Sequence, residues 1–172
     1  MKNEDGMGFE DGDPLCRLID VALDEASIVR WNADIDHERR VAIFDLLQQN
    51  YFDPVLPMPG GYEGPYRLLL RLEEGRLLFE LSDQDDHFLE AFRLPLTPFR
   101  RVIKDYFAVC DSYFQAIKTA SPGQIEAIDM GRRGLHNDGS ALLAERLKDK
   151  VLVDQNTARR LFTLICVLHI RG

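Results

Sequence analysis

Hydrophobic and polar positions alternate over short stretches in the first half of the chain and recur at helical spacing in the second half. Alternation of this kind predicts strands with one buried face, at residues 17–25, 65–72, 76–82 and 87–96. The runs that end at residue 72 and begin at residue 76 flank Glu73, Glu74 and Gly75, which predicts a three-residue hairpin loop. We therefore expect an antiparallel three-stranded meander over residues 65–96.

The first helix is predicted over residues 37–47, with Asn32 or Asp34 as its N-cap. Its apolar stripe consists of Ile35, Ile43, Phe44, Leu46 and Leu47. A Pro- and Gly-rich segment at residues 53–64 follows and predicts a loop.

A long amphipathic helix is predicted over residues 97–120, with Thr97 as the N-cap and Pro98 in the first turn. Its apolar face contains Phe99, Ile103, Tyr106, Cys110, Tyr113 and Ile117, widened by Phe107 and Phe114.

A further helix begins at once, because Ser121 and Gln124 form a capping-box pattern, and it is expected to run to about Met130. Residues 131–140, GRRGLHNDGS, contain three glycines and an Asn-Asp pair, and this composition predicts a turn. A short helix at 140–149, a strand at 150–153 and a final helix capped by Asp154 and ending near His169 complete the chain. That last helix is apolar on most sides, which places it in the core or in the interface of a homodimer.

These elements predict an α+β fold, in which an antiparallel sheet of three to five strands is packed by a C-terminal helical layer. The length of 172 residues fits one domain at 15–172, preceded by a disordered acidic tail at 1–14. The longest apolar run, at 161–168, is too short for a membrane span, and no signal peptide is recognised. The three cysteines form no CxxC pair, so we expect free thiols in a cytoplasmic protein.

Charge is distributed unevenly along the chain. Residues 1–97 carry a net charge of −12 and residues 98–172 one of +4, within a total of −8. This asymmetry predicts a surface that attracts anions, unless the two halves interleave on folding. A sequence pI of about 5.0 argues against a nucleic-acid partner.

The arginine pairs are the main candidates for a binding site. Arg100 and Arg101 fall in the first turn of a predicted helix, where the backbone already supplies positive potential, and Lys104 lies one turn beyond Arg100. A bound anion would explain them. The alternative is internal pairing, of Arg101 with Asp105 and of Arg100 with an acid from the first half.

The second arginine pair lies in the predicted turn, where Gly131 and Gly134 flank Arg132 and Arg133. His136 and Asn137 add a titratable ring and an amide, and together they suit a turn that binds an anion or a protein. The alternative is a tight connection between helices in which the glycines cap a helix end. If this pair and the first converge on one patch, both serve the same ligand.

A third pair, Arg159 and Arg160, is expected to form internal salt bridges because it follows the Asp154 cap. Catalytic and metal signals are weak: His37 and His136 have acidic neighbours but no metal-ligand spacing, and no nucleophile motif is present. We expect no metal and no cofactor.

Four segments, at residues 17–28, 96–107, 125–140 and 157–172, resemble uncharacterised protein family 0262, a bacterial group centred on alphaproteobacteria. The resemblance implies a cytoplasmic bacterial protein and brings no activity, cofactor or catalytic residue.

Two functions stay open after the sequence analysis. The first is a non-catalytic binding or regulatory module for an anionic ligand or an acidic protein surface. The second is a small hydrolase or transferase that uses His136 as its acid–base group on a phosphorylated substrate. An enzyme would hold His136 beside an acid in a closed pocket, and a binding module would present an open patch.

Overall fold

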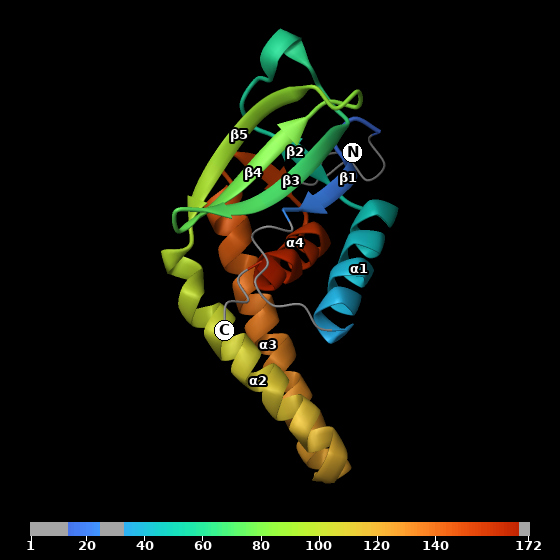
Figure 1. The fold of residues 1–172 in the computed structure, drawn as a ribbon, viewed down its shortest axis with the longest axis vertical. Helices are drawn as coiled ribbons and strands as arrows, with labels where there is room; N and C mark the ends of the chain where they lie inside the picture. Colours follow the sequence, from blue (N-terminus) through green and yellow to red (C-terminus); the bar gives the residue numbers. More distant parts are fainter. Residues whose placement is uncertain (1–13, 25–32, 169–172) are drawn as a thin grey trace, which may run out of the picture.

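The computed structural model describes residues 14–24 and 33–168, and it places a four-stranded sheet above four helices (Figure 1). The strand order is β1-β3-β4-β5. The predicted meander is confirmed, with β3 at Tyr66–Glu73, β4 at Arg76–Ser82 and β5 at Phe88–Pro95. The loop between β3 and β4 is one residue shorter than predicted, because Glu74 and Gly75 alone form the turn, both with positive φ.

The remaining strand of this sheet, β1 at Leu18–Leu23, pairs with β3 in parallel. The α+β class is therefore confirmed, but the sheet is mixed and not antiparallel throughout. A parallel pair needs a crossover connection, and here the chain passes through α1 at Ala33–Gln48 between the two strands. The alternating pattern of residues 17–25 identifies a strand but carries no information about the direction of its partner.

A second, two-stranded antiparallel sheet joins β2 at Phe52–Pro54 to β6 at Val151–Val153. The strand predicted at 150–153 is confirmed, whereas the segment predicted as a loop at 53–64 begins inside β2 and contains the short helix η2 at Pro59–Gly61. The backbone N–H of Phe52 donates to the carbonyl of Cys16, which ties this small sheet to the start of β1.

The first helix, α1, ends in an asparagine clamp that fixes its position against the sheet. The side-chain amide of Asn50 donates to the carbonyls of Leu46 and Leu18, and its oxygen accepts the N–H of Leu18 at 2.8 Å. The predicted stripe is correct at buried Leu46 and wrong at Phe44, which is 63% exposed. Asp34 lies inside the helix and is not its N-cap; Asn32 and the side chain of Ile35 lie outside the described part of the chain.

The second helix, α2 at Arg100–Thr119, follows a 3-10 turn, η3 at Thr97–Phe99. Thr97 therefore does not cap α2, and no side chain caps it. The predicted apolar face is buried at Ile103, Tyr106 and Cys110 but emerges further along, where Ile117 is 51% exposed. The second half of α2 thus extends beyond the core.

The third helix, α3 at Pro122–Leu147, is one continuous helix of 26 residues, so the turn predicted at 131–140 and the separate helix predicted at 140–149 are wrong. Ser121 and Gln124 form the predicted capping box. Glycine inside a helix costs about 1 kcal/mol relative to alanine. Packing against α2 and α4 offsets that cost, because Leu143 and Leu147 are fully buried.

The last helix, α4 at Gln155–Leu168, lies between α1 and α3 and forms the centre of the helical layer (Figure 1). Asp154 caps it as predicted, by accepting the N–H of Thr157 at 2.8 Å. Within the described residues, no helix has both the length and the apolar content that a bilayer span requires. The predicted tail at 1–14 lies outside the described residues except for Pro14.

Candidate functional site

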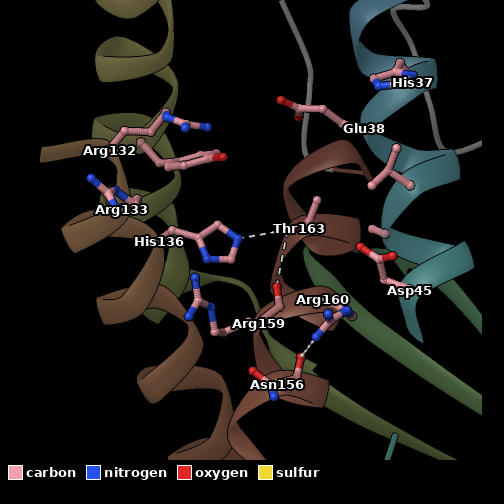
Figure 2. A pocket seen from close by; sticks show the side chains of 13 residues that line it. His37, Glu38, Asp45, Arg132, Arg133, His136, Asn156, Arg159, Arg160 and Thr163 are labelled. Atoms are coloured by element: carbon pink, nitrogen blue, oxygen red, sulfur yellow. Dashed lines mark hydrogen bonds between the residues drawn. The ribbon is translucent and has the colours of Figure 1, made fainter. Parts of the chain in front are cut away.

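A pocket of about 570 Å³ opens between α1, α3 and α4, with one residue from α2 (Figure 2). Figure 2 shows α1 on one side, α3 on the other and α4 between them. The lining residues are His37, Glu38, Val41, Ala42, Asp45, Tyr106, Arg132, Arg133, His136, Asn156, Arg159, Arg160 and Thr163. The pocket therefore brings four arginines and two carboxylates to one concave surface.

Arg159 and Arg160 contribute the cationic groups of α4, and the internal salt bridges predicted for them are not formed. Among the described residues, neither guanidinium has a carboxylate within 4.0 Å. The Nη1 of Arg160 donates to the backbone carbonyl of Asn156 at 3.2 Å, while its buried Nε has no acceptor. Both residues are half-buried, so two cations face the pocket without a counter-ion among the described residues.

Arg132 and Arg133 contribute the cationic groups of α3, and both are paired with Asp129. Helical spacing explains this, since Asp129 lies three and four residues before them. Arg132 makes a bidentate contact to one carboxylate oxygen, and the Nε of Arg133 lies 3.2 Å from the other. The hydrogen bond from Arg132 lowers the pKa of Asp129. Arg132 also lies over the ring of Tyr113, 5.0 Å from its centroid.

His136 lies between the arginines of α3 and α4 and is held by a hydrogen bond to α4. Its Nε2 lies 2.8 Å from the Thr163 hydroxyl, which also lies 3.2 Å from the carbonyl of Arg159. The rings of Tyr106 and Phe162 contact the imidazole edge to face, at 5.5 and 5.3 Å between centroids.

Burial, followed by the charges of Arg159 and Arg132, lowers the pKa of His136 to about 4. The ring is therefore neutral at pH 7. Among the described residues, no carboxylate oxygen lies within 4.0 Å of its nitrogens, so the arrangement expected of an enzyme, with His136 beside an acid, is not formed by them.

The wall formed by α1 presents two carboxylates: the sequence analysis considered Glu38 only as a neighbour of His37, and it did not single out Asp45. Glu38, Val41, Ala42 and Asp45 are spaced three, four and seven residues apart, so they lie on one face of the helix. Asp45 is half-buried and has no ion pair among the described residues. Figure 2 shows Glu38 and Asp45 on the side opposite Arg132 and His136. The pocket is thus acidic on one wall and basic on the other.

The other predicted binding residues lie outside the pocket lining. Arg101 is 94% exposed and lies 3.9 Å from Asp105, the internal partner considered from the sequence. Arg100 is exposed at the first residue of α2, and Lys104 is exposed one turn later. Asn137 is exposed on α3. The structure therefore does not bring Arg100 and Arg101 into the pocket that contains the second arginine pair.

The cysteines are free, with Cys110 and Cys166 buried and Cys16 half-buried. Burial raises the pKa of Cys110 and of Cys166, so neither thiol is activated as a nucleophile.

One group of side chains in the described residues has spacing compatible with a metal ion, namely Asp83, Asp85 and His87 in the turn between β4 and β5. Asp83 already accepts the backbone N–H groups of Asp85 and His87, both at 2.9 Å, and the bond from His87 lowers its pKa. These contacts hold the turn together. The sequence analysis did not identify this group, because it considered the acids beside His37 and His136.

The family relationship of the chain is clear over almost its full length. The sequence model of the Uncharacterised protein family (UPF0262) matches residues 15–171. A UPF0262 protein of Sphingopyxis alaskensis is 60% identical over 165 residues, covering 95% of this chain and 100% of the relative. A UPF0262 protein of Rhodospirillum rubrum is 58% identical over 155 residues, covering 90% and 93%.

A third relative, a UPF0262 protein of Brucella canis, is 57% identical over 159 residues, covering 92% of this chain and 97% of its own. No solved structure matches the chain. The resemblance noted from four segments thus extends over the whole described domain, and the chain belongs to uncharacterised protein family UPF0262, which is found in bacteria.

Proposed function

We propose that the protein is a non-catalytic binding module whose pocket holds a small anionic molecule. The observation that carries the proposal is the pair Arg159 and Arg160, which are half-buried at the pocket with no acidic partner among the described residues. Removing a charge from water costs free energy unless the charge is paired. A bound phosphate or carboxylate would supply that pairing, with the forked geometry that a guanidinium favours.

The shape of the site supports a small molecule rather than an acidic protein surface. A pocket of about 570 Å³ falls within the range of roughly 300–1,000 Å³ typical of ligand sites. Helices α1, α3 and α4 surround it, and α4, which carries Arg159 and Arg160, forms its floor.

The surroundings of His136 do not favour the alternative of a hydrolase or transferase. A general acid–base group works best with a pKa near the operating pH and needs a proton path to the substrate. Here the pKa is about 4, and Nε2 is hydrogen-bonded to the hydroxyl of Thr163. His136 therefore positions Thr163 and the adjoining turn of α4.

We also propose that the protein acts in the cytoplasm, a reducing compartment. Two of its three cysteines are buried as free thiols, which suits such a compartment.

The test is a calorimetric titration with inorganic phosphate at low ionic strength. We expect the wild-type protein to bind phosphate and the double variant Arg159→Gln, Arg160→Gln to bind at least tenfold more weakly. Hydrogen bonds to charged groups contribute about 1.5–3 kcal/mol each, which corresponds to about tenfold or more. Arg101→Gln is the matched control, because it removes an arginine outside the pocket lining.

Equal affinity of the wild-type and double-variant proteins would refute the proposal. A loss of binding in Arg101→Gln alone would instead assign the anion to the first turn of α2. Circular dichroism of each variant shows that a lost affinity is not a lost fold.

A further inference from the structure

Resting on the proposed anion site, we infer that the ligand is a small zwitterion, with an anionic group at Arg159 and Arg160 and a cationic group at Asp45. The chemical class is an amine joined by a short carbon chain to a phosphate or a carboxylate. The inference depends on three features of the pocket: an acid on α1 without a partner among the described residues, guanidinium groups on α4 that do not pair with it, and an apolar surface beside it.

Asp45 is the first feature. It lines the pocket from α1, is half-buried, and has neither an ion pair nor a side-chain hydrogen bond within the described part of the chain. A half-buried carboxylate without a partner is as costly as a half-buried guanidinium without one. An anion alone would satisfy the arginines of α4 but would leave Asp45 unpaired and would be repelled by it.

The second feature is that the opposite charges do not neutralise each other. No carboxylate oxygen of Asp45 lies within 4.0 Å of Arg159 or Arg160, although all three line the same pocket. Figure 2 shows Asp45 on α1 and the two arginines on α4. Complementary charges held apart across a cavity are suited to a molecule that carries both signs at its two ends.

The third feature is an apolar surface beside Asp45. Val41 and Ala42 lie on the α1 face between Glu38 and Asp45, and Val41 lines the pocket with 43% of its surface exposed. Tyr106 adds an aromatic surface from α2. These side chains offer contacts to the methylene groups of a ligand, which favours a carbon chain over a bare inorganic ion.

The test compares alkyl phosphates with aminoalkyl phosphates in which an ammonium group replaces the terminal methyl group. Propyl phosphate and phosphoethanolamine are the shortest pair, and chains of up to six carbons cover a range of charge separations. The matched carboxylates, such as pentanoate and 4-aminobutyrate, show which anion the arginines prefer. Each probe is titrated by calorimetry into the wild-type protein, Asp45→Asn, and Asp111→Asn, which removes an exposed acid outside the pocket lining.

We expect at least one amino compound to bind about tenfold more tightly than its methyl counterpart, as one charge-assisted hydrogen bond predicts. Asp45→Asn should abolish this preference without weakening the alkyl phosphate, and Asp111→Asn should retain it. Equal binding of every matched pair, or a preference that survives in Asp45→Asn, overturns the zwitterion and leaves the anion site intact. If no phosphate or carboxylate binds the wild-type protein, the proposed function fails and the inference with it.

Discussion

Substituting Gly139 with alanine tests the close contact between α3 and α4. Gly139 is buried where α3 meets the ring of Phe162. An added methyl group would lie 2.5 Å from Cε2 of that ring and nearer still to two other ring atoms. Carbon atoms in favourable contact are about 3.5–4.0 Å apart, so the ring would have to move by more than about 1 Å.

The ring has little freedom to make this movement. Phe162 is fully buried, and it packs edge to face against Tyr106 and His136. Overpacking a core of this kind costs about 1–3 kcal/mol. Replacing a helical glycine by alanine stabilises the helix by about 1 kcal/mol, which offsets part of this loss. Because the clash involves an aromatic ring held on several sides, we expect a net loss of about 2 kcal/mol in the free energy of unfolding.

Gly134→Ala is the matched control. Gly134 lies on the same helix, is exposed, and has no atom within 4 Å of the added methyl group. This variant should therefore be stabilised by about 0.5–1 kcal/mol. Urea unfolding followed by circular dichroism, at equal m-values, measures both changes. If Gly139→Ala stabilises the protein as much as Gly134→Ala does, the two helices do not approach each other as closely as described.

Three further outcomes are expected from the same urea assay. The pKa of His136 is about 4 in the folded protein and about 6.5 when unfolded, so only the unfolded chain takes up this proton between those values. Stability should fall by roughly 2 kcal/mol as the pH decreases from 6.5 to 4, and a slope that persists in His136→Gln would contradict this origin. Thr157→Val should lower the free energy of unfolding by about 1–3 kcal/mol, because the buried hydroxyl accepts the N–H of Tyr51 at 2.9 Å. An unchanged urea midpoint would show that water takes the place of the hydroxyl. Without ligand, Arg159→Gln and Arg160→Gln should leave the free energy of unfolding unchanged or raise it by up to about 1 kcal/mol, because neither cation has a counter-ion among the described residues. A loss of stability in either variant would contradict this.

Local signals in the sequence were sufficient for much of the fold. The meander follows from alternation and turn residues that act within a few positions, and Ser121 and Asp154 cap their helices through contacts three residues away. The long α3 was mispredicted because Gly131 and Gly134 are locally unfavourable in a helix, whereas its stability comes from contacts with α2 and α4. Such contacts depend on the whole fold.

The candidate site was predicted only in part, for the same reason. Arg132, Arg133 and His136 were identified from composition, but they were assigned to a turn that does not exist. Arg159 and Arg160 were assigned to internal salt bridges, because nothing in the sequence shows that α4 lies between α1 and α3. Periodicity could have shown that Glu38 and Asp45 share one face of α1, but not what that face opposes.

The length of α3 has a consequence for how its backbone hydrogen bonds open to solvent. At 1.5 Å per residue its 26 residues extend about 39 Å, and Figure 1 shows the end shared with α2 reaching well beyond the sheet. The projecting ends of α2 and α3 expose large apolar side chains, namely Phe114, Ile117 and Met130. The backbone amides of α3 should therefore exchange with solvent deuterium in a gradient, fastest near Ser121 and slowest near Leu143, by fraying that leaves the sheet intact. A ligand bound in the pocket would stop this fraying near Arg132, the first residue of α3 that lines the pocket.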